Sequence, residues 1–455
     1  MLKKAITLKN GDVKLYAVLL LWVVGLLMLT FFAERTNFGS LIFWSSLSFI
    51  AYFLLIGPFD LNEKTTGQLL WVGIIFRLAA VFAFPLLSDD IYRFFWDGRL
   101  MLADISPFAE LPSHLVASGM CPEKFDIELF EKLNSKEYYS VYPSVCQFVF
   151  ATGAFLFPKN IYGFAVFLKG FLFFCEVGTL YFLRRMGVSG KKLLLYALNP
   201  LIVLELCGNA HFEAAMLFFF VAALYSLNIH GCGAKKTSLA SGALLLSLSI
   251  ASKLLSIIFL PFLIKQLGWK KGVGLVLLAG IFSALLFAPF YDKNFIPHFT
   301  SSVSLYFRNF EFNASFYYVL KAIGNAVYGY TPVTLIAGIA NVLLVIGAAC
   351  LYWGRRDFFS SAFLLMTLYL LLQRAVHPWY LSTLVLLSAF VPWRFGLLWS
   401  GLVVLSYSHY NQNFYTENTY LLAVEYLLLL GFMLWEFFLP ENKSLLPDWF
   451  NSILK

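Results

Sequence analysis

Two adjacent carboxylates, Asp89 and Asp90, open a long polar segment that follows the third apolar stretch of the sequence. A carboxylate beside a substrate hydroxyl can accept its proton and so act as a general base. If the segment continues as a helix, Arg93 lies one turn further on and can orient one carboxylate while the other stays available. The structural alternative is that Ser88 caps this helix and that the helix dipole stabilises the two acids. The pair could also hold a divalent cation, although the sequence shows no clear set of further ligands.

A second polar group lies between two apolar stretches and consists of Glu205 and the run Gly208–Glu213. A charged side chain at the centre of a bilayer costs about 2.5–3.5 kcal/mol, so such residues usually face a cavity or a partner. The side chains of His211 and Glu213 carry the donors and acceptors that bind sugar hydroxyls. A hydrogen-bonded turn between two helices is the alternative explanation.

A third group is basic and is spread over the second half of the sequence as Lys253, Arg308, Arg374 and His377. A donor that carries a phosphate needs such groups to bind the phosphate and to stabilise it as it leaves. A lone Lys or Arg at a helix end more often extends its charge to the lipid headgroups. We expect the four residues to converge with the carboxylates on one side of a membrane.

Other side chains suit contact with a sugar or an acceptor, and they are Arg93, Trp96, Asp97, Asn313, Trp379 and Tyr380. The three aromatic ones among them can either stack on a sugar ring or anchor the chain at a membrane interface, and the sequence does not separate these roles. Four further charged residues fall inside apolar stretches, where charges normally pair with one another. We therefore expect buried ion pairs for Arg77, Lys169, Glu176 and Glu425.

The elements that must position these residues are membrane helices. The chain has 455 residues, of which 60% are hydrophobic and 13% charged, with a mean hydropathy of +0.77. A soluble domain of this composition could not cover its surface with polar groups. The net charge of +8 comes from scattered basic residues, which does not suggest a nucleic-acid partner. We expect an all-α polytopic membrane protein that forms a single transmembrane domain over residues 1–455.

Apolar runs of spanning length recur along the chain and predict a bundle of about 13–14 transmembrane helices. We place them near residues 15–32, 40–57, 69–87, 161–183, 193–209, 211–229, 239–252, 253–264, 272–290, 331–352, 358–376, 378–392, 395–409 and 420–439. The segments 239–252, 253–264 and 378–392 are short, which suggests half-helices or tilted pairs. The stretch 143–157 is expected to be a re-entrant or interfacial helix.

The basic residues also predict an orientation, because short loops rich in Lys and Arg stay in the cytoplasm. This rule places the N-terminus in the cytoplasm of a multi-pass plasma (inner) membrane protein. The polar loops 88–142 and 291–330 then lie on the extracytoplasmic side, the first of them with interfacial helices. Cys121 and Cys146 are the two cysteines that could meet outside the membrane, but their spacing alone does not establish a disulfide.

These motifs resemble those of the GT-C superfamily of integral-membrane glycosyltransferases, and within it the bacterial mannosyltransferases that use polyprenyl-phosphate sugars. Ser88–Arg99 and Ile105–Phe108 resemble the acidic motif of the large first outer loop. Later segments that resemble the family in the same order are Tyr142–Ser144, Gly208–Glu213, Phe312–Ser315 and His377–Tyr380. The resemblance covers roughly residues 85–380.

The resemblance implies an inverting hexosyl transfer, mannose-like, from a polyprenyl-phosphate donor in the membrane to a hydroxyl of a glycan, glycolipid or protein. It matches Asp89 to the base of the family and Asp90 to its acidic neighbour. Two features depart from the family pattern. Two additional spans precede the acidic loop, and Glu213 stands near His211 where the family more usually has an Asp.

Two other classes of protein would share part of this pattern. A transporter or flippase of lipid-linked sugars would also need a basic groove and aromatic residues. It would not need paired carboxylates, and it more often shows repeated halves, which this sequence lacks. A non-catalytic membrane scaffold would need neither the acidic pair nor the basic group.

Overall fold

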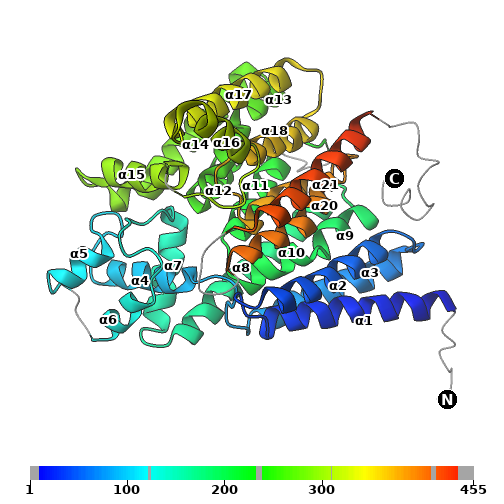
Figure 1. Cartoon of the computed structure of the whole chain (residues 1–455), viewed down its shortest axis with the longest axis horizontal. Helices are drawn as coiled ribbons and strands as arrows, with labels where there is room; N and C mark the ends of the chain where they lie inside the picture. Colours follow the sequence, from blue (N-terminus) through cyan, green and yellow to red (C-terminus); the bar gives the residue numbers. More distant parts are fainter. Residues whose placement is uncertain (1–9, 121–123, 232–237, 309, 411–416, 439–455) are drawn as a thin grey trace.

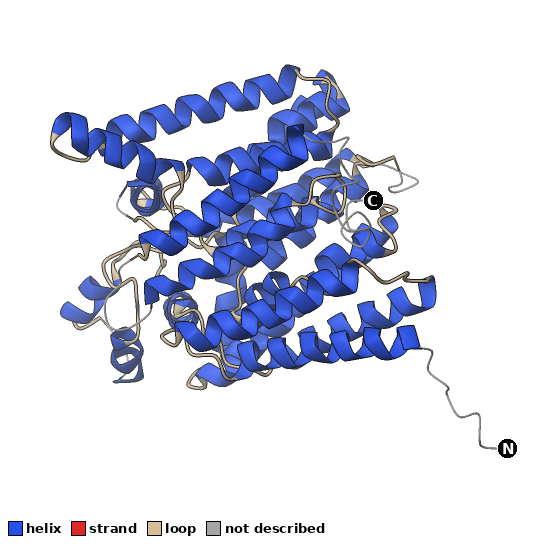
Figure 2. Ribbon diagram, turned by 45° about the vertical axis from the view of Figure 1, so that its right-hand side comes forward, coloured by secondary structure: helices blue, strands red, loops and turns tan. Residues whose placement is uncertain are grey.

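The computed structural model describes residues 10–120, 124–231, 238–308, 310–410 and 417–438, and these residues fold almost entirely into helices (Figure 1 and Figure 2). Side chains at 10–12, 124–125 and 305–308 lie outside the description. Within the described ranges, extended pairing is limited to one isolated parallel bridge between Phe312 and Ala375. The all-α prediction is therefore confirmed.

Six helices of the described ranges are long and apolar enough to cross a membrane. They are α1 (Asn10–Phe31), α2 (Phe38–Ile56), α8 (Ile161–Arg185), α14 (Trp269–Phe287), α17 (Val333–Trp353) and α21 (Thr419–Phe438). A bent pair adds a seventh if it counts as one span. The roughly 13–14 transmembrane helices expected from the sequence would require pairs of shorter helices to cross the membrane together. That number stays a prediction.

The other helices are shorter, and several of them follow one another directly with a change of direction or of helix type. They are α3 (Glu63–Ala80), α4 (Asp90–Leu102), α5 (Pro112–Ala117), α6 (Lys124–Glu131), α7 (Ser144–Leu156), α9 (Lys191–Ala197), α10 (Pro200–Ile202), η1 (Val203–Gly208), α11 (Glu213–Ser226), α12 (Leu239–Ser252), η2 (Leu254–Phe259), α13 (Leu260–Leu267), η3 (Ala288–Phe290), α15 (Phe295–Arg308), α16 (Phe316–Tyr328), α18 (Phe358–Leu372), η4 (Pro378–Leu381), α19 (Ser382–Leu387), α20 (Phe395–Leu402) and η5 (Val403–Tyr410).

Helix α3 lies earlier in the sequence than predicted. It begins after Asn62, whose side chain accepts a hydrogen bond from the Thr65 amide at 2.9 Å, as an N-cap does. It ends at Ala80, before the segment Phe82–Ser88, which contains Pro85. A proline disfavours helical conformation in the residue before it, so the chain leaves the helix before the acidic pair.

The break between α9 and α10 shows how the first three helices attach to the bundle. The last carbonyls of a helix lack intrahelical partners and need donors from elsewhere. Here side chains of α1, α2 and α3 supply them. The bonds are Trp22 Nε1 to Leu198 O at 2.8 Å, Tyr52 Oη to Leu195 O at 2.7 Å, and Arg77 Nη1 to Ala197 O at 2.6 Å.

A buried polar group, which we call the inner cluster, is formed by Arg77, Glu176 and Tyr196. Arg77 Nε lies 3.2 Å from Glu176 Oε2, and Tyr196 donates to Glu176 Oε1 at 2.6 Å. The predicted ion pairing is thus confirmed for Arg77 and Glu176. It is wrong for Lys169, which donates to a backbone carbonyl, and for Glu425, which accepts from Asn313 and Trp399.

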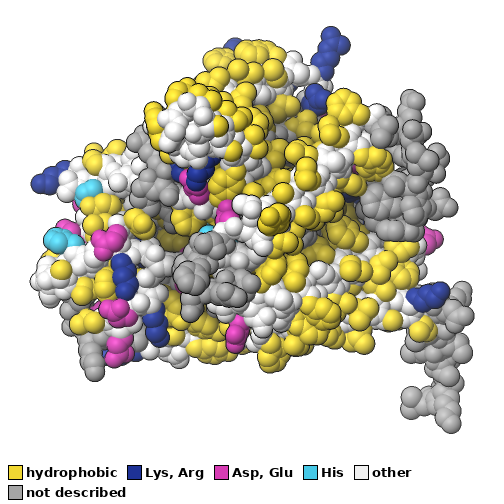
Figure 3. All heavy atoms as spheres, viewed as in Figure 1, with side chains coloured by type: hydrophobic (Ala, Val, Ile, Leu, Met, Phe, Trp, Pro, Cys, Tyr) yellow, Lys and Arg dark blue, Asp and Glu magenta, His cyan; other side chains and the backbone are white. Residues whose placement is uncertain are grey.

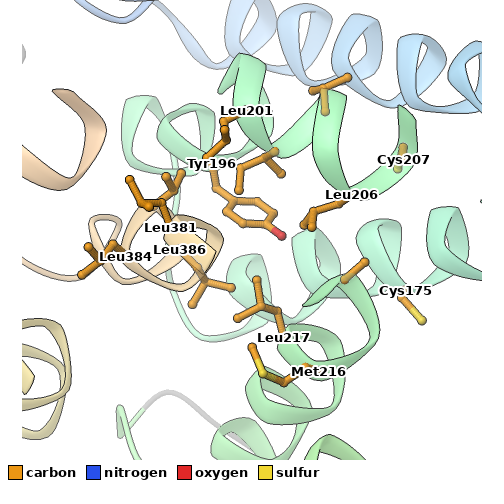
Figure 4. Packing of buried hydrophobic residues seen from close by; sticks show 14 of the residues in the cluster. Cys175, Tyr196, Leu201, Leu206, Cys207, Met216, Leu217, Leu381, Leu384 and Leu386 are labelled. Carbon is orange, nitrogen blue, oxygen red and sulfur yellow. The ribbon is translucent and has the colours of Figure 1, made fainter. Parts of the chain in front are cut away.

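Apolar side chains pack closely around the inner cluster. In Figure 4, Tyr196 lies among Leu201, Leu206, Leu217 and Leu386, which come from different helices. All five residues are buried. Because lipid is as apolar as leucine, such contacts hold membrane helices together mainly through close packing.

The polar loop 88–142 folds into the helices α4, α5 and α6, which lie together at one end of the bundle in Figure 1. We call this the loop end. The face shown in Figure 3 is largely hydrophobic, and most of its acidic side chains and its visible histidines lie in the half of the view that contains the loop end. On this face, acidic side chains and histidines are therefore concentrated near the loop end, while the rest of the surface suits contact with lipid.

Candidate active site

The acidic pair lies at the start of α4 and is held from two directions. Arg35 Nη2, from the α1–α2 connection, lies 2.5 Å from Asp89 Oδ2. Asn134 donates to Asp90 Oδ1 at 3.1 Å, and Ser88 Oγ accepts the Asp90 amide at 3.3 Å. The Asp89 side chain remains 43% exposed, so a substrate can reach it.

The prediction that Arg93 orients these carboxylates is wrong, because its guanidinium points into the protein. Arg93 Nε donates to Asp97 Oδ1 at 2.7 Å, and both side chains are buried. Asp97 Oδ2 also accepts hydrogen bonds from Ser140 at 2.5 Å and from Gln147 at 3.1 Å. Arg93 and Asp97 therefore tie α4 to the end of the polar loop, a geometry that supports a positioning role rather than contact with sugar.

The second polar group lies at a sharp break in a helix. The segments Pro200–Gly208 and Glu213–Ser226 meet at an angle of 111°. The first segment ends in the π-helical turn η1, and Ala210 adopts a left-handed φ of 64°. Both features cost conformational energy and are typical of functional sites. The break turns His211 and Glu213 into the interior, where both are buried.

Four rings from distant parts of the sequence form what we call the stacked column. His211 stacks on Trp379 with ring centroids 3.8 Å apart, and Trp379 stacks on His377 at 4.5 Å. Phe312 continues the stack on the other side of His377 at 4.7 Å. The structure thus brings three of the sequence-predicted site residues into direct contact.

Charged side chains surround the column. Glu205 Oε2 lies 3.3 Å from His211 Nε2, and Glu205 Oε1 accepts from the Tyr407 hydroxyl at 2.6 Å. Lys253 Nζ lies 2.6 Å from Glu213 Oε1 and 5.5 Å from the centre of the Tyr380 ring. Lys253 is placed here because α12 ends at Ser252 and the chain changes direction before η2.

His377 contributes a neutral ring to this site. Burial, together with the nearby charges of His211, Lys253 and His409, lowers the pKa of His377 to about 3. Its Nδ1 has no hydrogen-bond partner among the described residues. His377 can therefore exchange a hydrogen bond with a ligand, but it does not add a positive charge at neutral pH.

Arg374 forms an ion pair with the carboxylate of Glu311 in this structure. Its Nη2 lies 2.9 Å from Glu311 Oε1, and its guanidinium carbon lies 4.6 Å from the centre of the Tyr317 ring. Burial raises the pKa of Glu311, but hydrogen bonds from Lys321, Tyr317 and Arg374 outweigh this effect and lower it. The Phe312 amide donates to the Arg374 carbonyl at 2.9 Å. This hydrogen bond holds Phe312 beside the segment that carries His377.

Two other predicted residues are buried in a way that does not suit contact with a sugar, and the side chain of a third is not described. Asn313 is buried and donates to Glu425 at 3.0 Å. Trp96 is also buried and lines a small cleft with Arg99 and Asp126. Arg308 ends α15, and its side chain lies outside the described part of the structure.

The residues that connect the acidic pair to the column, Arg35 and Tyr410, are not among those predicted from the sequence. The guanidinium carbon of Arg35 lies 4.5 Å from the centre of the Tyr410 ring, and that ring lies 5.9 Å from Phe312. A signal for Arg35 was present, because a cation in a connection predicted to lie outside departs from the positive-inside rule. No comparable signal distinguished Tyr410 from the many other tyrosines.

The residues around the acidic pair do not fit a divalent cation. No group of three or more His, Cys, Asp or Glu side chains suited to a metal occurs within the described ranges. Asp89 faces a guanidinium and Asp90 an amide instead of further oxygen ligands. We therefore derive no chemical step through a metal. Cys146 is a free buried thiol that donates to the Ser252 carbonyl, whereas Cys121 lies outside the described residues.

Comparison with known proteins gives one family. Residues 149–268 match the family model described as "Alpha-(1->6)-mannopyranosyltransferase, N-terminal domain". The matched region includes the broken helix with His211 and Glu213, and also Lys253. A search of curated proteins finds no match for the chain. Over these residues the chain is similar to a family of mannosyltransferases, which are hexosyltransferases, in agreement with the motif resemblance.

Proposed function

We propose that the protein transfers mannose from a polyprenyl-phosphate donor to an acceptor hydroxyl on the extracytoplasmic face of the membrane. The observation that carries the proposal is a half-exposed carboxylate, Asp89, connected through Arg35 and Tyr410 to a buried column of histidines and a tryptophan. Sugar-processing sites need such a combination of a base, stacking surfaces and polar groups.

In the proposed reaction, Asp89 accepts the proton of the acceptor hydroxyl as its oxygen attacks the anomeric carbon of the donor. The new carbon–oxygen bond forms while the bond from the anomeric carbon to the phosphate oxygen breaks. The phosphate leaves with the bonding electrons and stays attached to its lipid. A single displacement of this kind inverts the anomeric centre, and it needs one base and no covalent intermediate.

Asp89 is better suited to be the base than Asp90. Its Oδ2 is held by Arg35, while its Oδ1 has no hydrogen bond among the described residues. Asp90 Oδ1 is bonded to Asn134, so each carboxylate keeps one oxygen without a hydrogen bond among the described residues. Asp89 is preferred because a guanidinium orients it and because the motif resemblance matches it to the base.

Lys253 is the cation best placed to bind the donor phosphate. It lies beside the column and the helix break, is 28% exposed on its side chain, and is within 2.6 Å of Glu213. Both cations are paired with a carboxylate, but the Arg374 side chain is only 8% exposed, so it is a weaker candidate. Trp379, His211 and Tyr380 are proposed to contact the mannose ring, with neutral His377 as a hydrogen-bond partner.

The proposed topology places the loop end outside the cell and the N-terminus in the cytoplasm. The basic residues near the other helix ends support it, because such residues remain cytoplasmic. A polyprenyl donor held in the outer leaflet would then present its phosphate and sugar at the loop end, while the tail lies against the apolar helix surfaces.

A transfer assay in proteoliposomes tests the proposal. The wild type and Asp89→Asn are incubated with radiolabelled polyprenyl-phosphate mannose and an acceptor oligosaccharide. We expect the variant to lose about 10²–10⁴-fold in rate, the contribution of a general base. Asp104→Asn is the matched control, because Asp104 is an exposed acid of the same polar loop. Full transfer by Asp89→Asn would overturn the assignment of the base, and movement of the lipid without transfer of sugar would favour a flippase.

A further inference from the structure

The connection between α1 and α2 places one cation at the acidic pair. Arg35 lies in this short connection, outside residues 149–268 that match the family model. Its Nη2 is 2.5 Å from Asp89 Oδ2, and its side chain is 20% exposed. The α1–α2 hairpin therefore reaches the residue that the proposed function makes the base.

Arg35 is also held from its other side. Its guanidinium lies 4.5 Å from the centre of the Tyr410 ring, a distance typical of a cation–π contact. Tyr410 lies near Tyr407, whose hydroxyl donates to Glu205 at 2.6 Å. The guanidinium thus contacts both the half-exposed carboxylate of Asp89 and the ring of Tyr410, which lies near Phe312 of the stacked column.

We infer that Arg35 is the positioning residue of Asp89. By binding Oδ2, the guanidinium fixes the rotamer of the carboxylate and presents Oδ1 to the acceptor hydroxyl. Tyr410 in turn fixes the guanidinium. This inference rests on the proposed function, and it assigns the first two helices the role of completing the site.

The chemistry of arginine suits this role. A planar guanidinium with fixed N–H directions orients a carboxylate, whereas an ammonium group acts as a point charge without a preferred direction. A misplacement of about 1 Å in a reacting group can cost on the order of 10²-fold in rate. The effect of losing Arg35 should therefore appear in the chemical step more than in donor binding.

Steady-state transfer by Arg35→Gln and Arg35→Lys tests the inference. We expect Arg35→Gln to lower kcat by roughly 10–100-fold with little change in the KM for the donor, and Arg35→Lys to recover part of that loss. Lys136→Gln is the matched control, because Lys136 also combines an ion pair, with Glu131 at 3.1 Å, and a ring contact, with Phe130 at 4.7 Å. It should transfer mannose at the wild-type rate.

A double variant separates positioning from general support of the fold. If Arg35 acts only through Asp89, Arg35→Gln should have no further effect on transfer once Asp89→Asn is present. A further loss in the double variant, or full kcat in Arg35→Gln, would overturn the inference. These outcomes differ from a failure of the proposed function, in which Asp89→Asn itself would keep full transfer.

Discussion

The two polar groups buried in this bundle differ in how completely their atoms are bonded. In the inner cluster, both oxygens of Glu176 accept hydrogen bonds, one from Tyr196 and one from Arg77, and only Arg77 Nη2 lacks a partner among the described residues. In the stacked column, His377 Nδ1 has no partner among the described residues, although the ring is buried. Buried polar groups are normally hydrogen-bonded, so an unbonded one needs an explanation.

This difference suggests different roles for similar residue types. The inner cluster joins α3, α8 and α9 where carbonyls at a helix break need donors. The column lies where another helix breaks. There several polar atoms lack hydrogen-bond partners among the described residues, and Lys253 stays partly exposed beside them. A ligand that supplies the missing hydrogen bonds would complete the second group, whereas the first is complete enough to hold the fold.

The largest expected effect is loss of the folded protein when the inner cluster is broken. Arg77→Met would leave the Glu176 carboxylate buried without its cation, at a cost of about 3–5 kcal/mol. Fluorescence-detected size exclusion in detergent would report the loss of a monodisperse species. Arg185→Met is the control, because Arg185 is exposed on α8. If Arg77→Met combined with Glu176→Gln folds again, the loss is due to the uncompensated charge of Glu176. A normal elution profile for Arg77→Met alone would contradict the structural role of the inner cluster.

Removing the centre of the stacked column should affect activity more than folding. Trp379→Ala removes two stacked contacts, each worth about 0.5–1.5 kcal/mol. We expect kcat/KM for the donor to fall by about 10–100-fold, mainly through KM, and Trp379→Phe to retain most of the activity. An alanine variant with unchanged kcat/KM would show that the column does not bind the substrate.

The neutral state of His377 predicts a dependence of stability on pH. The pKa of His377 is about 3 in the folded protein, below the ordinary value of about 6.5 in an unfolded chain. Between these values the unfolded state binds more protons, so stability falls as the pH decreases from 6.5 towards 3, by up to about 1.4 kcal/mol per pH unit. His377→Phe keeps a ring in the stack and removes the proton, so its unfolding temperature should decline less between pH 6.5 and 4.5. Equal declines in variant and wild type would contradict this prediction.

The sequence identified the parts of the site that depend on local composition. Asp89, His211 and His377 were found because polar residues beside apolar stretches are costly and therefore informative. The helical architecture and the breaks near residues 209 and 253 followed from the lengths of the apolar runs in the same way. The number of membrane crossings expected from these lengths stays a prediction, since several of the runs form apolar helices of only 10–17 residues.

Partners that come from distant segments could not be predicted. Helical spacing showed that Arg93 could reach a carboxylate one turn away, but Asp97 on its other side satisfies the same spacing. Which of the two it contacts depends on Ser140 and Gln147, which also bind Asp97. The contact between Arg35 and Asp89 joins residues 54 positions apart and depends on the packing of the first hairpin.

Donor binding to Asp89→Asn separates substrate binding from the chemical step. We assign Asp89 to the chemical step, and the stacked column with Lys253 to donor binding. The variant should therefore bind radiolabelled polyprenyl-phosphate mannose with the affinity of the wild type while forming almost no glycoside product. A variant that binds normally and still transfers mannose at the wild-type rate would contradict the account.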